Sequence, residues 1–156
     1  MKVSELMNRD LVSVEPGDSV EAAVKLLRRR VIRHLLVMKK GRLLGIVSDR
    51  DLKRALDPQQ TQKRILGIGG IYFLLEPILV EEIMTPNPLT VGPDTSANHA
   101  AWIMVERRFG ALPVVKDGKT VGIVTETDLL RYFAEMTIEP ERAAKKRVAG
   151  KRRRKA

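Results

Sequence analysis

The segment Gly45–Leu52, with the sequence GIVSDRDL, has a close copy in the segment Gly122–Leu129, with the sequence GIVTETDL. The copies lie 77 residues apart, from position 45 to position 122, and the same shift aligns residues 3–56 with residues 80–133 without a gap. Such self-similarity indicates a duplicated supersecondary unit. A unit of roughly 55 residues buries too little of its own surface to be stable alone, so the two copies are predicted to pack against each other.

Both copies show the same order of predicted elements around this segment. The first copy begins with a strand at 11–14, followed by a helix that starts with a capping box of Asp18 and Glu21 and runs through 20–31. A hairpin of the strands 35–38 and 43–47 comes next, and the copy ends with a helix from Ser48 to Leu56. The second copy has a strand at 89–91, a helix from Thr95, a hairpin that turns at 116–119, and a helix from Thr125 to Met136. Each copy is therefore predicted to mix strands and helices.

The composition narrows the class of protein. The chain has 156 residues, 44% of them hydrophobic, which fits one domain or two very small ones and argues against a large multidomain enzyme. It contains no cysteine, so disulfides and thiolate metal sites are excluded. Residues 1–10 form no apolar leader, and no uninterrupted apolar stretch reaches the roughly 20 residues of a membrane span. A cytoplasmic location without a membrane span is predicted.

The formal net charge of +10 comes almost entirely from one end of the chain. Between Arg142 and Lys155 there are nine Lys and Arg residues and no acid, so the rest of the sequence carries only +1. A polybasic segment of this kind is typical of binding to the phosphate backbone of RNA or DNA. A solubilising, disordered end is another interpretation of the same residues.

The order strand, helix, strand, strand, helix, with Gly-Ile-Val-(Ser/Thr)-x-x-Asp in both copies, resembles the cystathionine-β-synthase (CBS) domain family. The resemblance also rests on the segments Glu82–Thr85 (EIMT) and Phe109–Val115 (FGALPVV). It implies an α/β fold, a tandem CBS-domain pair or Bateman module, in which two β-α-β-β-α repeats pack with pseudo-twofold symmetry. On this interpretation residues 1–56 form repeat 1, residues 57–79 a partly helical linker, residues 80–138 repeat 2 and residues 139–156 a polybasic tail.

The resemblance also implies a function. Clefts between the repeats of such pairs bind adenosine-containing ligands such as AMP, ADP, ATP or S-adenosylmethionine, and the pairs assemble as homodimers through helical faces. The leading hypothesis is a stand-alone regulatory protein that needs no further cofactor and transmits occupancy of the cleft to an unknown downstream protein by conformational change. The alternative is a dimeric scaffold that binds nucleic acid through the tail at 142–155.

Residues at the ends of the two Gly-Ile-Val strands have the chemistry for a nucleotide. Ser48 can donate or accept at a phosphate or sugar, and the Asp51 carboxylate suits the paired hydroxyls of a ribose. Phosphates are expected near cations, for which Arg33, His34 and Arg50 are the candidates. With the positions that the resemblance adds at the cleft rim and the adenine edge, the candidate set is Ser13, Arg33, His34, Leu35, Ser48, Arg50, Asp51, Thr90, Ala111, Leu112, Pro113, Thr125, Thr127 and Asp128.

A structural role competes with ligand binding at these positions. Ser48-x-x-Asp51 and Thr125-x-x-Asp128 both have the spacing of a helix capping box, and the two roles can coexist. The two sites are also predicted to be unequal, because Arg50 in the first copy corresponds to Thr127 in the second. Charged phosphates should therefore fit the first site better.

No catalytic or metal site is predicted. His34 and His99 are the only histidines, and neither lies within a cluster of metal-ligating residues in the sequence. A triad of His34, Ser48 and Asp51 would lack a nucleophile elbow and an oxyanion hole. The chain is therefore not expected to be an enzyme.

Overall fold

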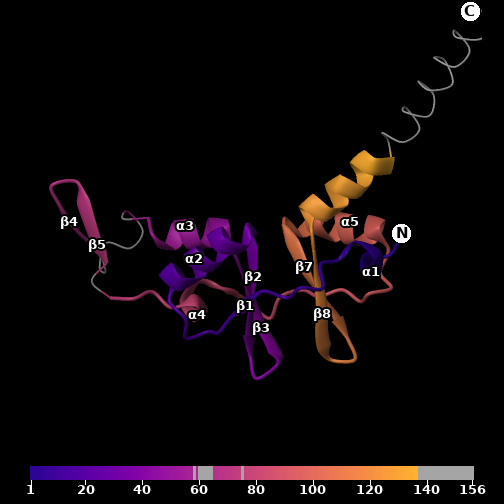
Figure 1. Cartoon of the computed structure of the whole chain (residues 1–156), viewed down its shortest axis with the longest axis horizontal. Coiled ribbons are helices and arrows are strands. Elements are labelled where there is room, and N and C mark those ends of the chain that lie inside the picture. Colours follow the sequence, from indigo (N-terminus) through magenta and orange to yellow (C-terminus); the bar gives the residue numbers. More distant parts are fainter. Residues whose placement is uncertain (58, 60–64, 75, 137–156) are drawn as a thin grey trace, which may run out of the picture.

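The structure is a computed structural model that describes residues 1–57, 59, 65–74 and 76–136 (Figure 1). Repeat 1 comprises β1 (Ser13–Val14), α2 (Val20–Arg30), β2 (His34–Lys39), β3 (Arg42–Ser48) and α3 (Asp49–Ala55). Strand β1 pairs in parallel with β2, and β2 pairs antiparallel with β3. The predicted order of elements is confirmed, although the first strand is shorter than the expected 11–14.

Repeat 2 has the same architecture and lies beside repeat 1 in Figure 1. It comprises α5 (Ala97–Arg107), β7 (Ala111–Lys116), β8 (Lys119–Thr125) and a helix over residues 126–136. The strand expected at 89–91 is reduced to one parallel bridge between Val91 and Val114, which corresponds to the pairing of Val14 with Val37 in repeat 1. The α/β fold with two equivalent repeats is therefore as predicted.

Both predicted hairpins form, and their turns explain why the second turn residue is glycine. The φ angles are 50° at Lys40 and 75° at Gly41, and 50° at Asp117 and 73° at Gly118. Two consecutive residues with positive φ make the tight turn whose twist matches that of the flanking strands, and glycine adopts this conformation without a steric penalty.

The long helices of the two repeats begin one residue later than the sequence suggested. The Ser19 hydroxyl accepts from the backbone N–H of Ala22 at 3.1 Å, so Ser19 and not Asp18 caps α2. Asp18 instead accepts from the backbone N–H of Glu15 at 2.8 Å and closes the preceding turn. Ser96 caps α5 in the same way as Ser19 caps α2. The prediction of a capping box at Asp18 was wrong because its side chain reaches the turn before the helix.

Two short helices exchange between the repeats. Helix α1 (Val3–Leu6) packs into the core of repeat 2, and α4 (Val80–Ile83) packs into the core of repeat 1. Val3 and Val80, one on each helix, are fully buried. The Val3 N–H donates to the Thr95 carbonyl at 2.8 Å, and the Val80 N–H donates to the Asp18 carbonyl at 2.8 Å. Each repeat core therefore needs a segment that precedes the other repeat in the sequence, which ties the two repeats together.

The glycines of the Gly-Ile-Val strands make room for these exchanged segments. A Cβ on Gly45 would lie 2.6 Å from Met84 Sδ and 2.9 Å from the Thr85 carbonyl oxygen. A Cβ on Gly122 would lie 2.5 Å from Met7 Sδ and 2.9 Å from its Cγ. The close approach at each glycine is therefore made by another part of the chain. The chain crosses β3 as strand β6 (Thr85–Pro86), and Asn8 pairs with Ile123 of β8 in the equivalent way.

The linker between the repeats contains a hairpin where helical structure was expected. Strands β4 (Ile65–Ile68) and β5 (Ile71–Leu74) pair antiparallel and project beyond the helices of repeat 1 in Figure 1. Gly69 and Gly70 both have positive φ, at 59° and 81°, and make the turn between the strands. Within the partly helical linker predicted for 57–79, residues 65–74 are therefore strands and a turn, because this glycine pair favours a tight turn over a continuous helix. Residues 58, 60–64 and 75 of the linker lie outside the described residues, as does the predicted tail at 139–156.

Candidate functional site

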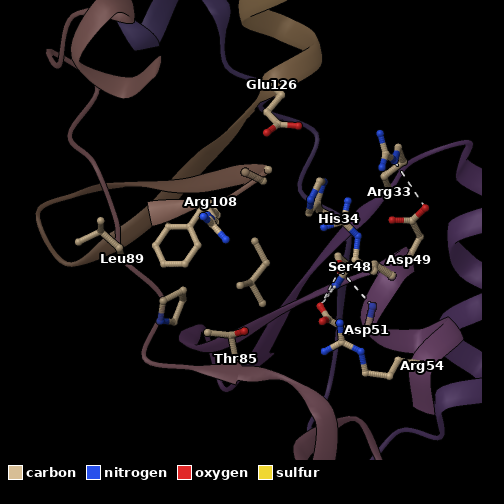
Figure 2. A pocket seen from close by; sticks show the side chains of 16 residues that line it. Arg33, His34, Ser48, Asp49, Asp51, Arg54, Thr85, Leu89, Arg108 and Glu126 are labelled. Carbon is tan, nitrogen blue, oxygen red and sulfur yellow. Dashed lines mark hydrogen bonds and ion pairs between the residues drawn. The ribbon is translucent and has the colours of Figure 1, made fainter. Parts of the chain in front are cut away.

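A pocket with a volume of about 330 Å³ lies between the two repeats and is called here the arginine pocket (Figure 2). This volume lies at the lower end of the range typical of small-molecule sites. Repeat 1 contributes Arg33, His34, Ile46, Ser48, Asp49, Arg50, Asp51 and Arg54. The other wall is formed by Thr85, Pro88, Leu89, Arg108, Phe109, Gly110, Ala111 and Glu126.

A second pocket of the same volume, called here the acidic pocket, uses the opposite combination of repeats. Its lining is Asn8, Asp10, Val12, Val31, Ile32, Arg33, His34, Gly110, Ile123, Thr125, Glu126, Thr127 and Asp128. The shift of 77 residues relates Ser48 to Thr125 and Asp51 to Asp128, so the two pockets are pseudo-symmetric. Neither pocket can form within one repeat.

The serine and aspartate of the arginine pocket form a capping box. The backbone N–H and the hydroxyl of Ser48 donate to Asp51 Oδ2 at 2.8 and 2.6 Å, and the Asp51 N–H donates to Ser48 Oγ at 3.2 Å. Thr125 and Asp128 repeat this arrangement with distances of 2.8, 2.7 and 3.3 Å. The structural role is therefore confirmed in both copies. Because the cap uses Oδ2 of each aspartate, it leaves Oδ1 of Asp51 available to a ligand, whereas Oδ1 of Asp128 lies 3.9 Å from Arg131 Nη1.

The arginine pocket concentrates cations that form no ion pair with any carboxylate in the described residues. Within the ranges that the structure describes, Arg50, Arg54 and Arg108 make no ion pair. Arg33, in contrast, lies 3.5 Å from Asp49. In Figure 2, Arg108 approaches from repeat 2, opposite Arg54 of repeat 1. Unpaired guanidinium groups from both walls suit an anion such as phosphate.

His34 lies at the junction of the two pockets. It lines both of them, and its ring packs so closely on Gly110 that a Cβ there would lie 2.9 Å from Nε2. Burial lowers the pKa of the His34 imidazole below its ordinary value, and the Arg33 guanidinium lowers this pKa further. The nearby carboxylates of Asp49, Glu126 and Asp51 oppose this shift of the pKa. The imidazole is therefore neutral at neutral pH and can both donate and accept a hydrogen bond.

The structure brings most of the candidate residues to the pockets. Arg33, His34, Ser48, Arg50, Asp51 and Ala111 line the arginine pocket, and Thr125, Thr127 and Asp128 line the acidic pocket with Arg33 and His34. The five others, Ser13, Leu35, Thr90, Leu112 and Pro113, are absent from both linings. Leu35, Leu112 and Pro113 are fully buried, and Ser13 of β1 and Thr90 are exposed. Their roles in ligand binding remain predictions.

Sequence reasoning missed Arg54, Arg108 and Glu126 as pocket residues. The predicted cations belong to the same copy as Asp51, whereas Arg108 belongs to the other repeat. The signal that could have found Arg108 is its position beside Phe109, at the start of the motif that carried the family resemblance. Only the packing of the repeats shows which motif faces which.

The part of the chain that the structure describes contains neither a metal-ligand cluster nor a helix that could span a membrane. No group of three or more His, Cys, Asp or Glu side chains there could hold a metal ion. None of the helices in those ranges combines the length and the apolar character that crossing a membrane requires.

The chain belongs to the CBS-domain family. The family model, described as "CBS domain", matches twice, at residues 3–58 and 80–135. These matches and the duplicated fold define the class as a CBS-domain pair.

Curated relatives include both enzymes and small CBS proteins. The chain is 36% identical to an inosine-5'-monophosphate dehydrogenase of Korarchaeum cryptofilum over 78% of its own length, but it spans only 22% of that protein. It is 33% identical to CBS domain-containing protein DDB_G0289609 of Dictyostelium discoideum, with 88% of this chain and 94% of the relative covered. The chain thus corresponds to a small part of the enzyme and to nearly all of the small protein.

Solved structures of similar proteins contain adenosine compounds. The CBS domain pair of protein MJ0100, in complex with 5'-methylthioadenosine and S-adenosyl-L-methionine, has a TM-score of 0.73 and 28% identity, covering 87% of this chain and 98% of that one. CBSX2 in complex with AMP has a TM-score of 0.68 and 35% identity, with 87% and 98% covered. These similarities agree with the pseudo-symmetric pockets described above. Nothing in the site or in these relatives supports the nucleic-acid alternative, which rested on residues 142–155, outside the described ranges.

Proposed function

We propose that this chain is a regulatory CBS pair that binds an adenosine nucleotide in the arginine pocket. The observation that carries this proposal is the convergence of Arg50, Arg54 and Arg108, none with an ion-pair partner in the described ranges, on a pocket that also contains Asp51. A nucleotide needs both features, because its phosphates require cations and its ribose hydroxyls require an acceptor.

The residues of the pocket suggest how the nucleotide would lie. The ribose would donate to Asp51 Oδ1, since Oδ2 already accepts from the backbone N–H and hydroxyl of Ser48. The phosphates would extend toward the unpaired arginines and away from the carboxylate. The base would lie against the apolar wall that includes Leu89 and Phe109. The AMP complex of the similar CBSX2 supports an adenosine monophosphate as the first candidate.

Nucleotide binding would change the relative position of the two repeats, because residues of both repeats form the arginine pocket. Arg54 lies on repeat 1 and Arg108 on repeat 2, so a phosphate bound by both would favour one relative position of the repeats. A ligand shifts such an equilibrium only by its difference in affinity for the two positions. The downstream protein would recognise the position that the ligand favours, and no catalytic step is involved.

The homodimer is part of the proposal and is supported by an apolar surface on repeat 2. Trp102, Val105, Leu130, Phe133 and Met136 lie on α5 and the helix at 126–136 and are all exposed, Val105 at 76%. The shift of 77 residues places Lys25, Arg28 and Lys53 at the first three equivalent positions of repeat 1. The substitution Trp102→Lys introduces the residue found at the equivalent position 25 of repeat 1. It is expected to lower the dimer fraction measured by sedimentation equilibrium. An average molecular mass equal to that of the wild type would contradict this interface.

Titration calorimetry with AMP, ADP and ATP tests nucleotide binding. Arg54→Gln removes one unpaired cation and is expected to weaken nucleotide binding by about tenfold, since a charge-assisted hydrogen bond contributes on the order of 1.5–3 kcal/mol. Arg131→Gln is the matched control, because Arg131 is the equivalent residue of repeat 2, lines neither pocket and lies 3.9 Å from Asp128. Absence of binding by all three nucleotides, or equal losses in both variants, would overturn the proposal.

A further inference from the structure

We infer that helix α2 of repeat 1 is a docking surface for an acidic helix of the downstream protein. The surface consists of Lys25, Arg28 and Arg29 and is called here the basic face. The inference deepens the proposed function, because it names the chemistry of the partner. It rests on that function only in treating the chain as a regulatory protein.

The basic face lies on the side of α2 that points away from the core. Ala23 and Leu27 of this helix are buried in the core of repeat 1. Lys25, Arg28 and Arg29 are exposed. Residues separated by three or four positions share one side of a helix. The three cations therefore form one group along the solvent side of α2.

The cations of the basic face are more than helix-end charges. Within the ranges that the structure describes, none of the three forms an ion pair, whereas Arg30 does. Cations in the last turn of a helix stabilise its dipole, which is a structural role for Arg28 and Arg29. Lys25 precedes the last turn, and the equivalent helix α5 ends with one cation, Arg107. The helix dipole therefore explains only part of this charge.

The equivalent side of repeat 2 has a different chemistry. The shift of 77 residues relates the three cations to Trp102, Val105 and Glu106. Trp102 and Val105 belong to the apolar surface proposed above as the dimer interface. A twofold contact between two basic faces would bring like charges together, which is unfavourable. The basic face therefore fits an acidic partner better than an identical face of a second copy.

The charge pattern of α2 favours a protein over a uniform polyanion. Glu21 is exposed on the same helix, about one turn before Lys25. A phosphate backbone or an anionic membrane would be repelled by Glu21, whereas a protein can place a neutral or basic residue opposite it. The sequence of α2 also contains no aromatic residue on which bases could stack. Glutamates spaced at three and four residues on a partner helix would match the spacing of the cations.

The basic face is adjacent in the chain to residues of the pockets. Helix α2 ends at Arg30, and Arg33 and His34, which follow it, line both pockets. The segment 25–34 therefore has the partner surface at one end and pocket residues at the other. Two distinct sites on one continuous segment are what coupling between ligand and partner requires.

The test uses two labelled peptides and the whole chain. One peptide is an alanine-rich helix of about 20 residues whose glutamates recur at spacings of three and four residues, on one side of the helix. The other has the same composition with its glutamates distributed around the helix. Fluorescence anisotropy is expected to show that the first binds about tenfold more tightly. The nine cations between positions 142 and 155 attract both peptides alike, because the two peptides carry the same charge.

A charge-reversal variant assigns the binding to the basic face. Lys25→Glu combined with Arg28→Glu is expected to weaken binding of the first peptide by about tenfold. Lys39→Glu combined with Arg42→Glu is the matched control, because these exposed cations lie opposite each other at the end of the β2–β3 hairpin. A peptide with lysines in place of the glutamates should bind the α2 variant about tenfold more tightly than the wild type, a gain that a misfolded variant would not show.

Three results would overturn the inference. Equal binding of the two glutamate peptides, or equal losses in the two double variants, would remove the basic face as a helix-docking surface. A DNA duplex that loses as much affinity as the peptide in the α2 variant would replace the protein partner with a nucleic acid. A lower dimer fraction of that variant in sedimentation equilibrium would assign the face to a second copy.

Titration of AMP into the same variants separates this inference from the proposed nucleotide site. AMP binding is expected to be unchanged in the α2 variant, because Lys25 and Arg28 line neither pocket. Peptide binding that depends on the basic face, without binding of any adenine nucleotide, would overturn the nucleotide site and support the docking surface. Nucleotide binding without peptide binding would overturn the docking surface and leave the nucleotide site standing.

Discussion

The two repeats are alike where they exchange helices and differ where they form pockets. Val3 and Val80 occupy equivalent places in the exchanged helices and are both fully buried. Arg50 and Thr127 occupy equivalent places in the two pockets and differ in charge. Packing explains the first similarity, because a buried side chain must match the volume of its surroundings. Exposure permits the second difference, since Arg50 and Thr127 lie at the surface and no core depends on them. Duplication thus preserved the crossings and left the pockets free to diverge.

The glycines at the crossings should give the largest effects. Gly45→Ala is expected to destabilise the fold by about 3 kcal/mol, because the new Cβ would meet a backbone carbonyl at 2.9 Å that cannot rotate away. Gly122→Ala should cost less, since its two nearest neighbours are atoms of the flexible Met7 side chain. Urea unfolding measures both. Gly17→Ala is the control, because nothing lies within 4 Å of its Cβ, and a similar loss in all three would contradict the role of the crossings.

Substitutions in the exchanged helices α1 and α4 should each loosen the core of the other repeat. Val3→Ala and Val80→Ala should each cost about 2 kcal/mol, the loss expected for a fully buried valine. Amide hydrogen exchange should then show faster exchange of Val114 and Val124 in the Val3 variant, and of Val37 and Val47 in the Val80 variant. The opposite pattern, with each variant loosening its own sequence repeat, would refute the exchange.

The charge difference between the pockets can be reduced by one substitution. Arg50→Thr gives the arginine pocket the residue found at position 127 and is expected to weaken AMP binding by about tenfold, or roughly 1.4 kcal/mol. Lys53→Thr is a control on the same helix, because Lys53 lies outside the pocket lining. Calorimetric titration measures the affinity, and unchanged AMP binding in Arg50→Thr would remove Arg50 from the site.

The ends of α2 and α5 offer a stabilising change. Val31 and Arg108 both cap their helices in the left-handed conformation, with φ of 54° and 56°. Because a β-branched residue pays the larger steric penalty there, Val31→Gly is expected to stabilise the fold by about 1 kcal/mol and Arg108→Gly by less. Thermal unfolding measures both changes, and a loss of stability in Val31→Gly would show that this cap is not strained.

His34 should give the smallest effect, a dependence of stability on pH. Because the folded state lowers the pKa of His34, the unfolded chain takes up a proton first as the pH falls through the ordinary histidine range near 6.5. Folding stability is therefore expected to decrease below that pH, and less so in His34→Gln. Urea unfolding at pH 7.5 and 5.5 measures the difference. His99→Gln is the control because His99 is exposed and lines neither pocket, and equal slopes in wild type and His34→Gln would contradict the prediction.

Local patterns in the sequence were sufficient for most elements of the two repeats and for a minority of the residues that line each pocket. The hairpin turns at Lys40-Gly41 and Asp117-Gly118 follow from residues adjacent in the chain, as do the caps at Ser48 and Thr125. The candidate residues that reached a pocket, such as Asp51 and Arg50, come from these local motifs. The linker was predicted less well, because its apolar residues fit a helix as well as a strand, and only the positive φ angles of Gly69 and Gly70 show the turn of a hairpin.

What the sequence determined by itself is the duplicated α/β unit, its strand and helix order, and the position of the Gly-Ile-Val motifs. These depend on hydrophobic periodicity and on the conformations of neighbouring residues. Only the tertiary structure decided that α1 packs into the core of repeat 2, that Met84 and Met7 cover Gly45 and Gly122, and that Arg108 of repeat 2 lines the same pocket as Asp51. The physical reason is that these contacts join residues distant in the chain, where burial and steric fit, and no local preference, select the partner.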